Sequence, residues 1–481
     1  RALLAAEVLG GLRALVDAPP PPSLEPAWRV LLRNEFHDIL PGSGIREVYE
    51  RAEAELADVL ATAGRAEEEH LTALTEGWAA AAGGRPALLA VNCELRGRPV
   101  RAELLEDVPG GQRTDGGWVV AAAEEVPGLG ARVLIDPQPV PGLSVSRGHL
   151  ENAAIRVELA EDGTLARVFD RRAGRDVLDG RGNQLWAYVD KPRGWDAWDV
   201  DAGYPDQGEE ISDLESCEVV EEGPHRVAIR LRRRFRGSRI EQDLRLWSNS
   251  PRLEVRTRLD WHDRRWLLKA RFPVAVRSPY ASFETAFGVV QRPTHRNTSW
   301  DAARFEVAGH RFVDLSEPGY GVALLNDGRY GHDVLGSELG LSLLRAPVHP
   351  DPLADEGAHT FTYALCPHAG DWLAGGVLAE AEDLNQPLRV RRGSADRATT
   401  WQPLRLDGLA LGLGCLKPLE DGGGLALRVY EPQGARGTTT LTLPGGWQAA
   451  EELDLLERPA GPVDPTFRPF QVRTWRLERA R

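Results

Sequence analysis

A chain of 481 residues is too long for a single hydrophobic core, and its length predicts about three or four domains. Its hydrophobic fraction of 42% and charged fraction of 27% are ordinary for a globular protein, whereas its formal net charge of −14 argues against nucleic-acid binding, which needs a basic face. No stretch approaches the ~18 apolar residues of a membrane span, so we expect neither nucleic acid nor a membrane as a partner.

The sulfur-containing residues give two further indications. The chain has no methionine, and an apolar helical pattern begins directly at Ala2, so we expect a chain that starts inside a longer protein; the loss of a short tag or a disordered end is the alternative. The cysteines are widely spaced and form no CxxC pair, which predicts reduced, buried thiols and a cytoplasmic protein. They are Cys93, Cys217, Cys366 and Cys415.

The first part of the chain predicts three helices. Residues 1–16 are apolar and are followed by a run of prolines that ends the helix. Apolar residues over 25–39 recur at spacings of three and four, as in an amphipathic helix. The same period continues from Ile45 to Trp78 and predicts a third, long helix. We expect an antiparallel three-helix bundle over residues 1–82.

Beyond this bundle the apolar period changes to two, which is typical of β-strands. Residues 83–150 hold enough short strands for a small β-domain. Over residues 151–386, strands such as Arg226–Phe235 alternate apolar residues with arginine, as in antiparallel sheets with one solvated face, and we expect a large multi-sheet β-sandwich domain. Residues 387–481 predict a C-terminal β-sandwich. The expected fold class is therefore multidomain and mainly β.

The segment Phe36–Gly44, which ends the second predicted helix and leads through a Pro-Gly turn to the third, carries the first candidate site. His37 is suited to zinc binding, and Asp38 could orient it, bind the metal or accept hydrogen bonds from sugar hydroxyls. No HxxxH or HxxE pattern lies nearby, so His37 needs further ligands from elsewhere. The alternative is a histidine packed at a helix end, with Asp38 capping the turn.

A second stretch, Asp190–Tyr204, places two tryptophans among several carboxylates. Trp195 and Trp198 could stack on sugar rings, while Asp196 and Asp199 accept hydrogen bonds from hydroxyl groups. Carboxylate pairs also act as acid and nucleophile in glycoside hydrolysis. The alternative is a loop that its tryptophans anchor onto its own sheet.

Two further polar clusters are expected at strand ends. Arg292 and His295 could line a substrate cleft. His349, His359 and His368 match no metal-binding spacing. No GxSxG, P-loop or dinucleotide fingerprint is present, which excludes the common nucleotide-binding and α/β-hydrolase motifs.

Together, these stretches resemble the family-38 glycoside hydrolases, the class II α-mannosidases. The resemblance is firmest over residues 25–65 and 150–370. It implies retaining, zinc-dependent hydrolysis of terminal α-linked mannose in glycans. The motifs that carry it are, in chain order, Phe-His-Asp-Ile-Leu-Pro-Gly-Ser from Phe36, Trp-Asp-Ala-Trp-Asp from Trp195, Arg-Pro-Thr-His from Arg292, Tyr320-Gly321 to Tyr330-Gly331, and Leu-Leu-Arg-x-Pro from Leu343.

In that family, an N-terminal catalytic domain supplies the nucleophile, the acid/base carboxylate and most zinc ligands. The resemblance therefore implies that His37 is one zinc ligand and that Asp38 contacts mannose, whereas no catalytic residue is assigned in this chain. Zinc is the expected cofactor and mannose-containing glycans are the expected partners, and we expect the chain alone to be inactive.

Two rival hypotheses stay open. One is a non-catalytic carbohydrate-binding protein that uses Trp195 and Trp198 as a stacking platform. The other is a structural scaffold whose β-domains serve only assembly. The sequence also leaves open whether the chain forms homo-oligomers.

Overall fold

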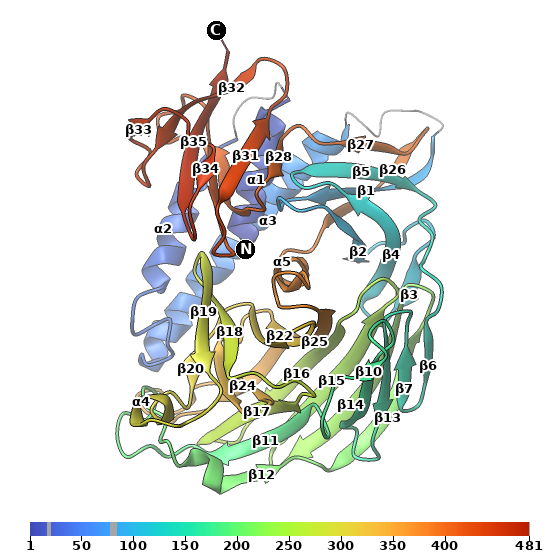
Figure 1. The fold of residues 1–481 in the computed structure, drawn as a ribbon, viewed down its shortest axis with the longest axis vertical. Coiled ribbons are helices and arrows are strands. Elements are labelled where there is room, and N and C mark those ends of the chain that lie inside the picture. Colours follow the sequence, from blue (N-terminus) through green and yellow to red (C-terminus); the bar gives the residue numbers. More distant parts are fainter. Residues whose placement is uncertain (17–20, 77–83, 481) are drawn as a thin grey trace.

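The structure, a computed structural model, describes residues 1–16, 21–76 and 84–480. Three helices lie at the N-terminal end, and several antiparallel sheets follow them (Figure 1). This arrangement confirms the mainly β fold with an N-terminal helical region that the residue patterns predict. Among the described helices, none is both long enough and apolar enough to cross a membrane.

The three N-terminal helices pack side by side, and α1 and α3 run in the same direction. Arg13 of α1 forms an ion pair with Glu69 of α3 (3.3 Å), while Arg33 of α2 pairs with Glu55 (2.7 Å), so α2 runs in the opposite direction. Small and branched apolar residues fill the space between them. The helices are α1 (Ala2–Ala14), α2 (Glu25–Asn34) and α3 (Arg46–Glu76).

Two predicted boundaries differ from the structure or lie outside its description. Helix α2 ends at Asn34, short of the predicted 39, because the apolar residues that extend the pattern, Phe36 and Leu40, are exposed and do not pack in the bundle. Trp78 and the boundary between residues 82 and 83 fall in residues 77–83, outside the described residues.

Two small sheets follow the helices. One has the order β26-β1-β5-β27, and the other has the order β2-β4-β3. The first sheet joins segments on both sides of residue 386, because Val91 pairs with Arg389. Their strands are β1 (Arg85–Asn92), β2 (Arg98–Leu104), β3 (Gln112–Thr114), β4 (Gly117–Val126), β5 (Gly130–Ile135), β26 (Arg389–Ala395) and β27 (Thr399–Trp401).

The largest sheet has nine strands, which run from β13 at one edge to β19 at the other. Its strands alternate as the sequence predicts: Ile229 and Leu231 are buried in the core, whereas Arg230 and Arg232 form cross-strand pairs on the other face. In spatial order they are β13 (Leu214–Glu222), β14 (Arg226–Phe235), β15 (Ser238–Trp247), β16 (Leu253–Trp261), β25 (Gly357–Ala369), β22 (Tyr320–Asn326), β21 (Phe312–Glu317), β18 (Tyr280–Thr285) and β19 (Gly288–Pro293).

A six-stranded and a five-stranded sheet share one large hydrophobic core with it. In spatial order the six are β12 (Gly208–Glu210), β11 (Gln184–Val189), β17 (Trp266–Pro273), β24 (Glu338–Arg345), β23 (Gly331–Leu335) and β20 (Val307–Ala308). The five are β10 (Arg175–Asp176), β9 (Leu165–Asp170), β8 (Ile155–Leu159), β7 (His149–Glu151) and β6 (Ser144–Ser146). Short helices α4 (Ser299–Ala302) and α5 (Val377–Asn385) and a 3-10 turn, η1 (Tyr204–Gln207), lie between strands.

The C-terminal strands form two further sheets that lie beside the helices at one end of the molecule (Figure 1). Helix α1 packs against them, since its buried leucines share a core with theirs. The strands are β28 (Arg405–Gly408), β29 (Gly412–Pro418), β30 (Leu425–Tyr430), β31 (Gly437–Thr442), β32 (Trp447–Leu453), β33 (Pro459–Gly461), β34 (Thr466–Phe467) and β35 (Val472–Arg479).

Candidate functional site

A pocket of about 730 Å³ forms where the turn between α2 and α3 meets two loops of the large β-region. We call it the turn pocket. It brings together three segments that are far apart in the sequence: the Phe36–Gly44 turn, the tryptophan loop after β11, and the segment after β24. Its lining residues are Phe36, Asp38, Ile39, Ser43, Gly44, Ile45, Val48, Trp195, Asp196, Ala197, Trp198, His349 and Pro350.

Tyr49 of α3 fixes the conformation of the turn. Its hydroxyl accepts the N–H of Gly44 (2.8 Å) and donates to the carbonyl of Asp38 (3.0 Å). The N–H of Ser43 donates to the same carbonyl (3.2 Å). Gly42 has a φ of +82°, a conformation that glycine adopts at no steric cost. A helical side chain and a glycine together therefore set the direction in which His37 and Asp38 project.

His37 faces solvent and is available as a ligand. Its side chain is 73% exposed, its Nε2 lies 3.8 Å from the Asp38 carboxylate, and its ring lies 4.1 Å from the ring of Phe36. This exposure does not match the alternative of a packed helix-end histidine. A single imidazole is one ligand of the three or four that zinc needs. Within residues 1–16, 21–76 and 84–480, no group of three His, Cys, Asp or Glu side chains is arranged to hold a metal ion.

The two tryptophans of the loop lie on the surface beside this turn. Trp195 is 80% exposed and Trp198 is 65% exposed, so neither ring anchors the loop onto its sheet. A tight turn places them together, since the N–H of Trp198 donates to the carbonyl of Trp195 (2.7 Å). Trp195 has a φ of +59°, a costly conformation for a bulky residue, and such strain is often found at functional sites.

The two aspartates of the loop differ in their contacts. The carboxylate of Asp196 accepts the N–H of Val348 (2.7 Å) and lies 3.5 Å from the guanidinium of Arg265. Asp196 therefore ties the tryptophan loop to the segment after β24. Asp199 is exposed, and its carboxylate accepts only the N–H of Val200 (3.0 Å) among the described residues.

Arg345, the last residue of β24, holds the whole loop in place. Its guanidinium donates to both oxygens of the buried Asp190 (2.5 and 3.2 Å), to the carbonyl of Asp196 (2.7 Å) and to the carbonyl of Asp199. Burial raises the pKa of Asp190, and the guanidinium opposes this shift. The motif that begins at Leu343 contains this arginine, but no feature of the motif indicates this role.

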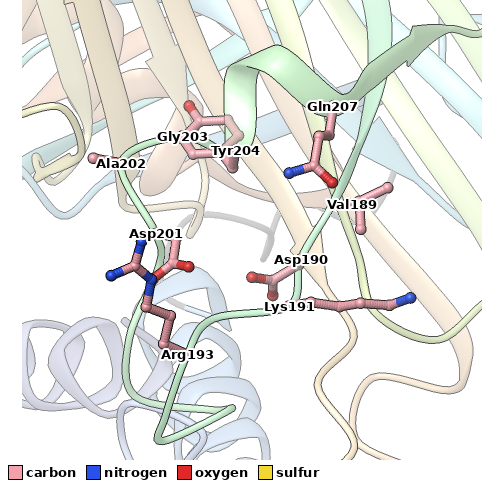
Figure 2. Close-up of a pocket in the computed structure, with 9 residues that line it drawn as sticks. All are labelled: Val189, Asp190, Lys191, Arg193, Asp201, Ala202, Gly203, Tyr204 and Gln207. Atoms are coloured by element: carbon pink, nitrogen blue, oxygen red, sulfur yellow. The ribbon is translucent and has the colours of Figure 1, made fainter.

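A second pocket, of about 450 Å³, lies on another side of the same loop. Figure 2 shows the side chain of Arg193 next to Asp201: Arg193 lies with Asp190 and Lys191 on the limb of the loop that leaves β11, and Asp201 lies on the limb that leads to η1. Tyr204 forms part of its wall and is fixed there because its hydroxyl donates to Glu306 (2.5 Å). The loop between β11 and η1 thus lines two pockets: its charged residues line this second pocket, and its exposed tryptophans line the turn pocket.

The predicted site residues therefore divide into two groups. Asp38, Trp195, Asp196 and Trp198 line the turn pocket, with His37 and Asp199 adjacent to them in the chain. His349, which the sequence left unassigned, also lines this pocket, and a histidine a few residues after Arg345 was the only available signal.

Arg292 and His295 do not line the turn pocket. The guanidinium of Arg292 lies 4.6 Å from the centre of the Phe283 ring, and His295 lies 3.6 Å from the Asp301 carboxylate. Arg292 lies in strand β19 and His295 follows it, at the opposite edge of the nine-stranded sheet from β13. Their predicted role in a substrate cleft stays a prediction.

Three domain families match this chain. The α-mannosidase middle domain matches residues 1–74, the glycosyl hydrolases family 38 C-terminal domain matches residues 150–353, and the family 38 C-terminal β-sandwich domain matches residues 410–475. The chain belongs to glycosyl hydrolase family 38. The turn pocket of this family member lies between the first two matched regions, which together contribute all its lining residues.

Relatives and solved structures agree with this assignment. Human α-mannosidase 2C1 is 38% identical over 94% of this chain, and α-mannosidase G of Dictyostelium discoideum is 33% identical over 68% of it. These alignments cover 45% and 32% of the two relatives, so the chain spans less than half their length. The crystal structure of an α-mannosidase from Enterococcus faecalis V583 superposes with a TM-score of 0.81 at 16% identity, over 99% of this chain and 66% of that one, and shows the shared fold.

Proposed function

We propose that this chain forms one side of the active site of a retaining, zinc-dependent α-mannosidase that acts on terminal α-linked mannose in glycans. The observation that carries the proposal is the turn pocket, where Asp38, Trp195 and Trp198 meet beside the exposed His37. The similarity to α-mannosidases supports the choice of mannose among sugars.

Each residue has a proposed role that follows from its position. The imidazole of His37 is one zinc ligand, and the remaining ligands and the nucleophile come from residues outside this chain. Zinc, when bound, would act as a Lewis acid and orient sugar hydroxyl groups. Asp38 accepts hydrogen bonds from those hydroxyls, and the exposed rings of Trp195 and Trp198 supply apolar faces for the sugar.

Asp196 and Arg345 have positioning roles in this proposal. Asp196 uses its carboxylate to bind the N–H of Val348, so it is less available to a substrate than Asp38. Arg345 neutralises the buried Asp190 and holds the loop that presents the tryptophans. We also propose a cytoplasmic location, which the four free cysteines support.

The direct test is hydrolysis of 4-nitrophenyl α-mannoside by the chain as given, with metal analysis of the same sample. We expect no turnover and less than one zinc ion per chain, because one imidazole binds zinc weakly. Turnover that a chelator abolishes would show that the chain is catalytically complete. It would contradict the proposal that the chain forms only one side of the active site.

The exposure of Trp195 and Trp198 also favours the second candidate, a carbohydrate-binding protein without catalysis. The two hypotheses differ in what Trp198→Ala does. If the chain alone binds methyl α-mannoside and loses this affinity in Trp198→Ala, the binding protein is favoured. If the chain alone has no measurable affinity for methyl α-mannoside, the first proposal is favoured, in which this chain forms one side of the active site. Sugar binding would then need the zinc and its other ligands.

A further inference from the structure

The second pocket, of about 450 Å³, is lined by the loop between β11 and η1 and by the adjoining ends of those two elements. We call it the loop pocket. It shares no lining residue with the turn pocket, which residues 195–198 of the same loop help to line. The residues used below are Asp190, Lys191, Arg193, Asp201, Tyr204 and Gln207.

Several polar side chains of the loop pocket are available to a ligand. Among the described residues, no side-chain hydrogen bond or ion pair is found for Lys191, Arg193, Asp201 or Gln207. Arg193 can only donate hydrogen bonds, Asp201 can only accept them, and the amide of Gln207 can do both. In Figure 2, the polar ends of Asp201 and Gln207 point into the space between the two limbs of the loop, and Arg193 lies beside Asp201. A ligand in this pocket therefore meets donors and acceptors together.

The charges around the loop pocket balance one another. The carboxylate of Asp190 is paired with the guanidinium of Arg345 (2.5 and 3.2 Å). Arg193 and Asp201 lie next to each other with opposite charges, and the ammonium group of Lys191 points away from both carboxylates (Figure 2). Asp201 would repel an anion and Arg193 would repel a cation. This balance favours a neutral ligand.

Tyr204 gives the loop pocket a fixed aromatic wall. It is 4% exposed, its hydroxyl donates to Glu306 (2.5 Å), and its ring packs edge to face on the ring of Tyr188 (5.1 Å between centres, 85°). Because these contacts hold the ring in place, little ordering is needed when a ligand binds. An aromatic wall with polar groups around it suits a sugar, which has apolar C–H faces and hydroxyl groups at its edges.

We propose that the loop pocket is a second glycan-binding site, which takes a neutral oligosaccharide of two or three sugar units. A hydroxyl group both donates and accepts, so neighbouring hydroxyls can satisfy Arg193, Asp201 and Gln207 together, whereas an apolar ligand would leave these groups without partners. The volume lies within the range of about 300–1,000 Å³ that is typical of ligand pockets, and it is larger than one sugar ring. The choice of mannose as the sugar rests on the proposed function, but the site itself uses none of the zinc-facing residues.

The test is isothermal titration calorimetry of the chain with α-linked mannotriose. We expect measurable affinity for mannotriose and none for methyl α-mannoside, whose single ring contacts only part of the pocket. Two charged trimers of similar size, trimannuronate and the glucosamine trimer, should each bind at least tenfold more weakly than mannotriose. Absence of mannotriose binding would overturn the proposal, and so would tighter binding of a charged trimer that depends on Arg193 or Asp201.

Asp201→Asn and Gln207→Ala identify the site. Neither side chain has a protein partner among the described residues, so both variants should fold, and each should bind mannotriose about tenfold more weakly. Asp206→Asn makes the same change as Asp201→Asn at a residue that does not line the pocket, and it should bind as the unmodified chain does. Trp198→Ala, which removes a wall of the turn pocket, should also keep its affinity for mannotriose. Loss of binding in Trp198→Ala, with none in Asp201→Asn and Gln207→Ala, would place the sugar in the turn pocket and contradict the proposal.

This outcome is separate from that of the proposed function. Zinc binding and turnover decide the proposed function, and the titration measures neither. Mannotriose binding that depends on Asp201 and Gln207 would support the loop pocket even if the chain proved to be catalytically complete. Unchanged affinity in both variants would overturn the loop pocket and leave the proposed function as it stands.

Discussion

At the scale of single residues, Arg345 has the most consequential contacts in the turn-pocket region. One guanidinium bridges the buried Asp190 and two backbone carbonyls of the loop that carries the tryptophans. Arginine suits this position because its planar fork can donate in several directions at once, whereas lysine is a point charge on a flexible stem. The geometry of the candidate site thus depends on a residue that does not line the turn pocket.

Arg345→Lys tests this dependence. The change keeps the positive charge and loses most of the hydrogen bonds, so we expect the free energy of unfolding to fall by about 1–3 kcal/mol. Chemical denaturation measures the loss, and tryptophan fluorescence reports the rearranged loop. The matched control is Arg234→Lys, whose exposed pair with Glu215 should change stability by about 0.5 kcal/mol or less. Equal effects in both variants would contradict the positioning role.

At the scale of elements, the turn Phe36–Gly44 is held by a side chain of the neighbouring helix as well as by its own Gly42 and Ser43. Tyr49 lies on the first turns of α3 and contacts both ends of the turn through its hydroxyl. Helix α2 ends early, and its continuation becomes the wall of a pocket. The apolar residues of this turn therefore line the turn pocket or face solvent, and they do not pack in the helix bundle.

Removing the Tyr49 hydroxyl should loosen the turn locally. In Tyr49→Phe we expect the amide of Gly44 to exchange with solvent about tenfold faster, because it loses its acceptor, and stability to fall by about 1–2 kcal/mol. Hydrogen exchange followed by mass spectrometry measures the first effect. Tyr280→Phe, at an exposed tyrosine, is the control and should leave both quantities unchanged. Unaltered exchange at Gly44 would argue that other contacts hold the turn.

At the scale of the whole molecule, a buried ionic cluster joins three parts of the chain. Asp383 of α5 lies 3.0 Å from Arg101 of β2, 2.9 Å from Arg252 at the start of β16, and 3.6 Å from Arg98. All four side chains are buried. Burial opposes ionisation of Asp383, but the three guanidinium groups outweigh it and hold its pKa below the usual value.

Asp383→Asn should therefore destabilise the chain strongly. The change removes the carboxylate that Arg98 pairs with and one of the counter-charges of Arg101 and Arg252, which keep Glu380 and Glu254, and breaking a buried ionic cluster costs about 3–5 kcal/mol. Chemical denaturation at pH 7 measures this loss. Asp421→Asn removes an exposed partner of Arg476 and should cost about 1 kcal/mol or less. A loss no larger than that of Asp421→Asn would contradict the cluster's structural role.

The pH dependence of this difference has a defined sign. Because the folded-state pKa of Asp383 lies below its ordinary value of 3.8, its ionised form stabilises the fold above that value. The stabilisation is lost as the pH falls below about 4, where the carboxylate gains a proton in the unfolded state first and in the folded state later. The stability difference between the unmodified chain and Asp383→Asn should thus shrink below pH 4.

The sequence predicted the kinds of element well and their ends less well. The change of apolar period near residue 83 correctly separated helices from strands, because burial of one face imposes that period on every helix and strand. The end of α2 was wrong because Phe36 and Leu40 continue the helical pattern for another reason, which is to form a pocket wall and an exposed surface. The spacing of apolar residues in a sequence does not show which surface those residues contact.

The candidate site was predicted in part. His37, Asp38, Trp195 and Trp198 stood out because their residue types bind metals and sugars, and the structure places all but His37 on the walls of one pocket. His349 was missed, since nothing in its local sequence distinguishes it from other loop histidines. The role of Arg345 was missed because its partners lie about 150 positions earlier in the chain.

The sequence by itself determined the mainly β architecture and the family, because local apolar patterns indicate the first and short motifs indicate the second. Only the tertiary structure decided which of those motifs meet. Residues near 37, 195 and 349 converge in the turn pocket because sheet packing places their loops together, and no local interaction encodes that approach.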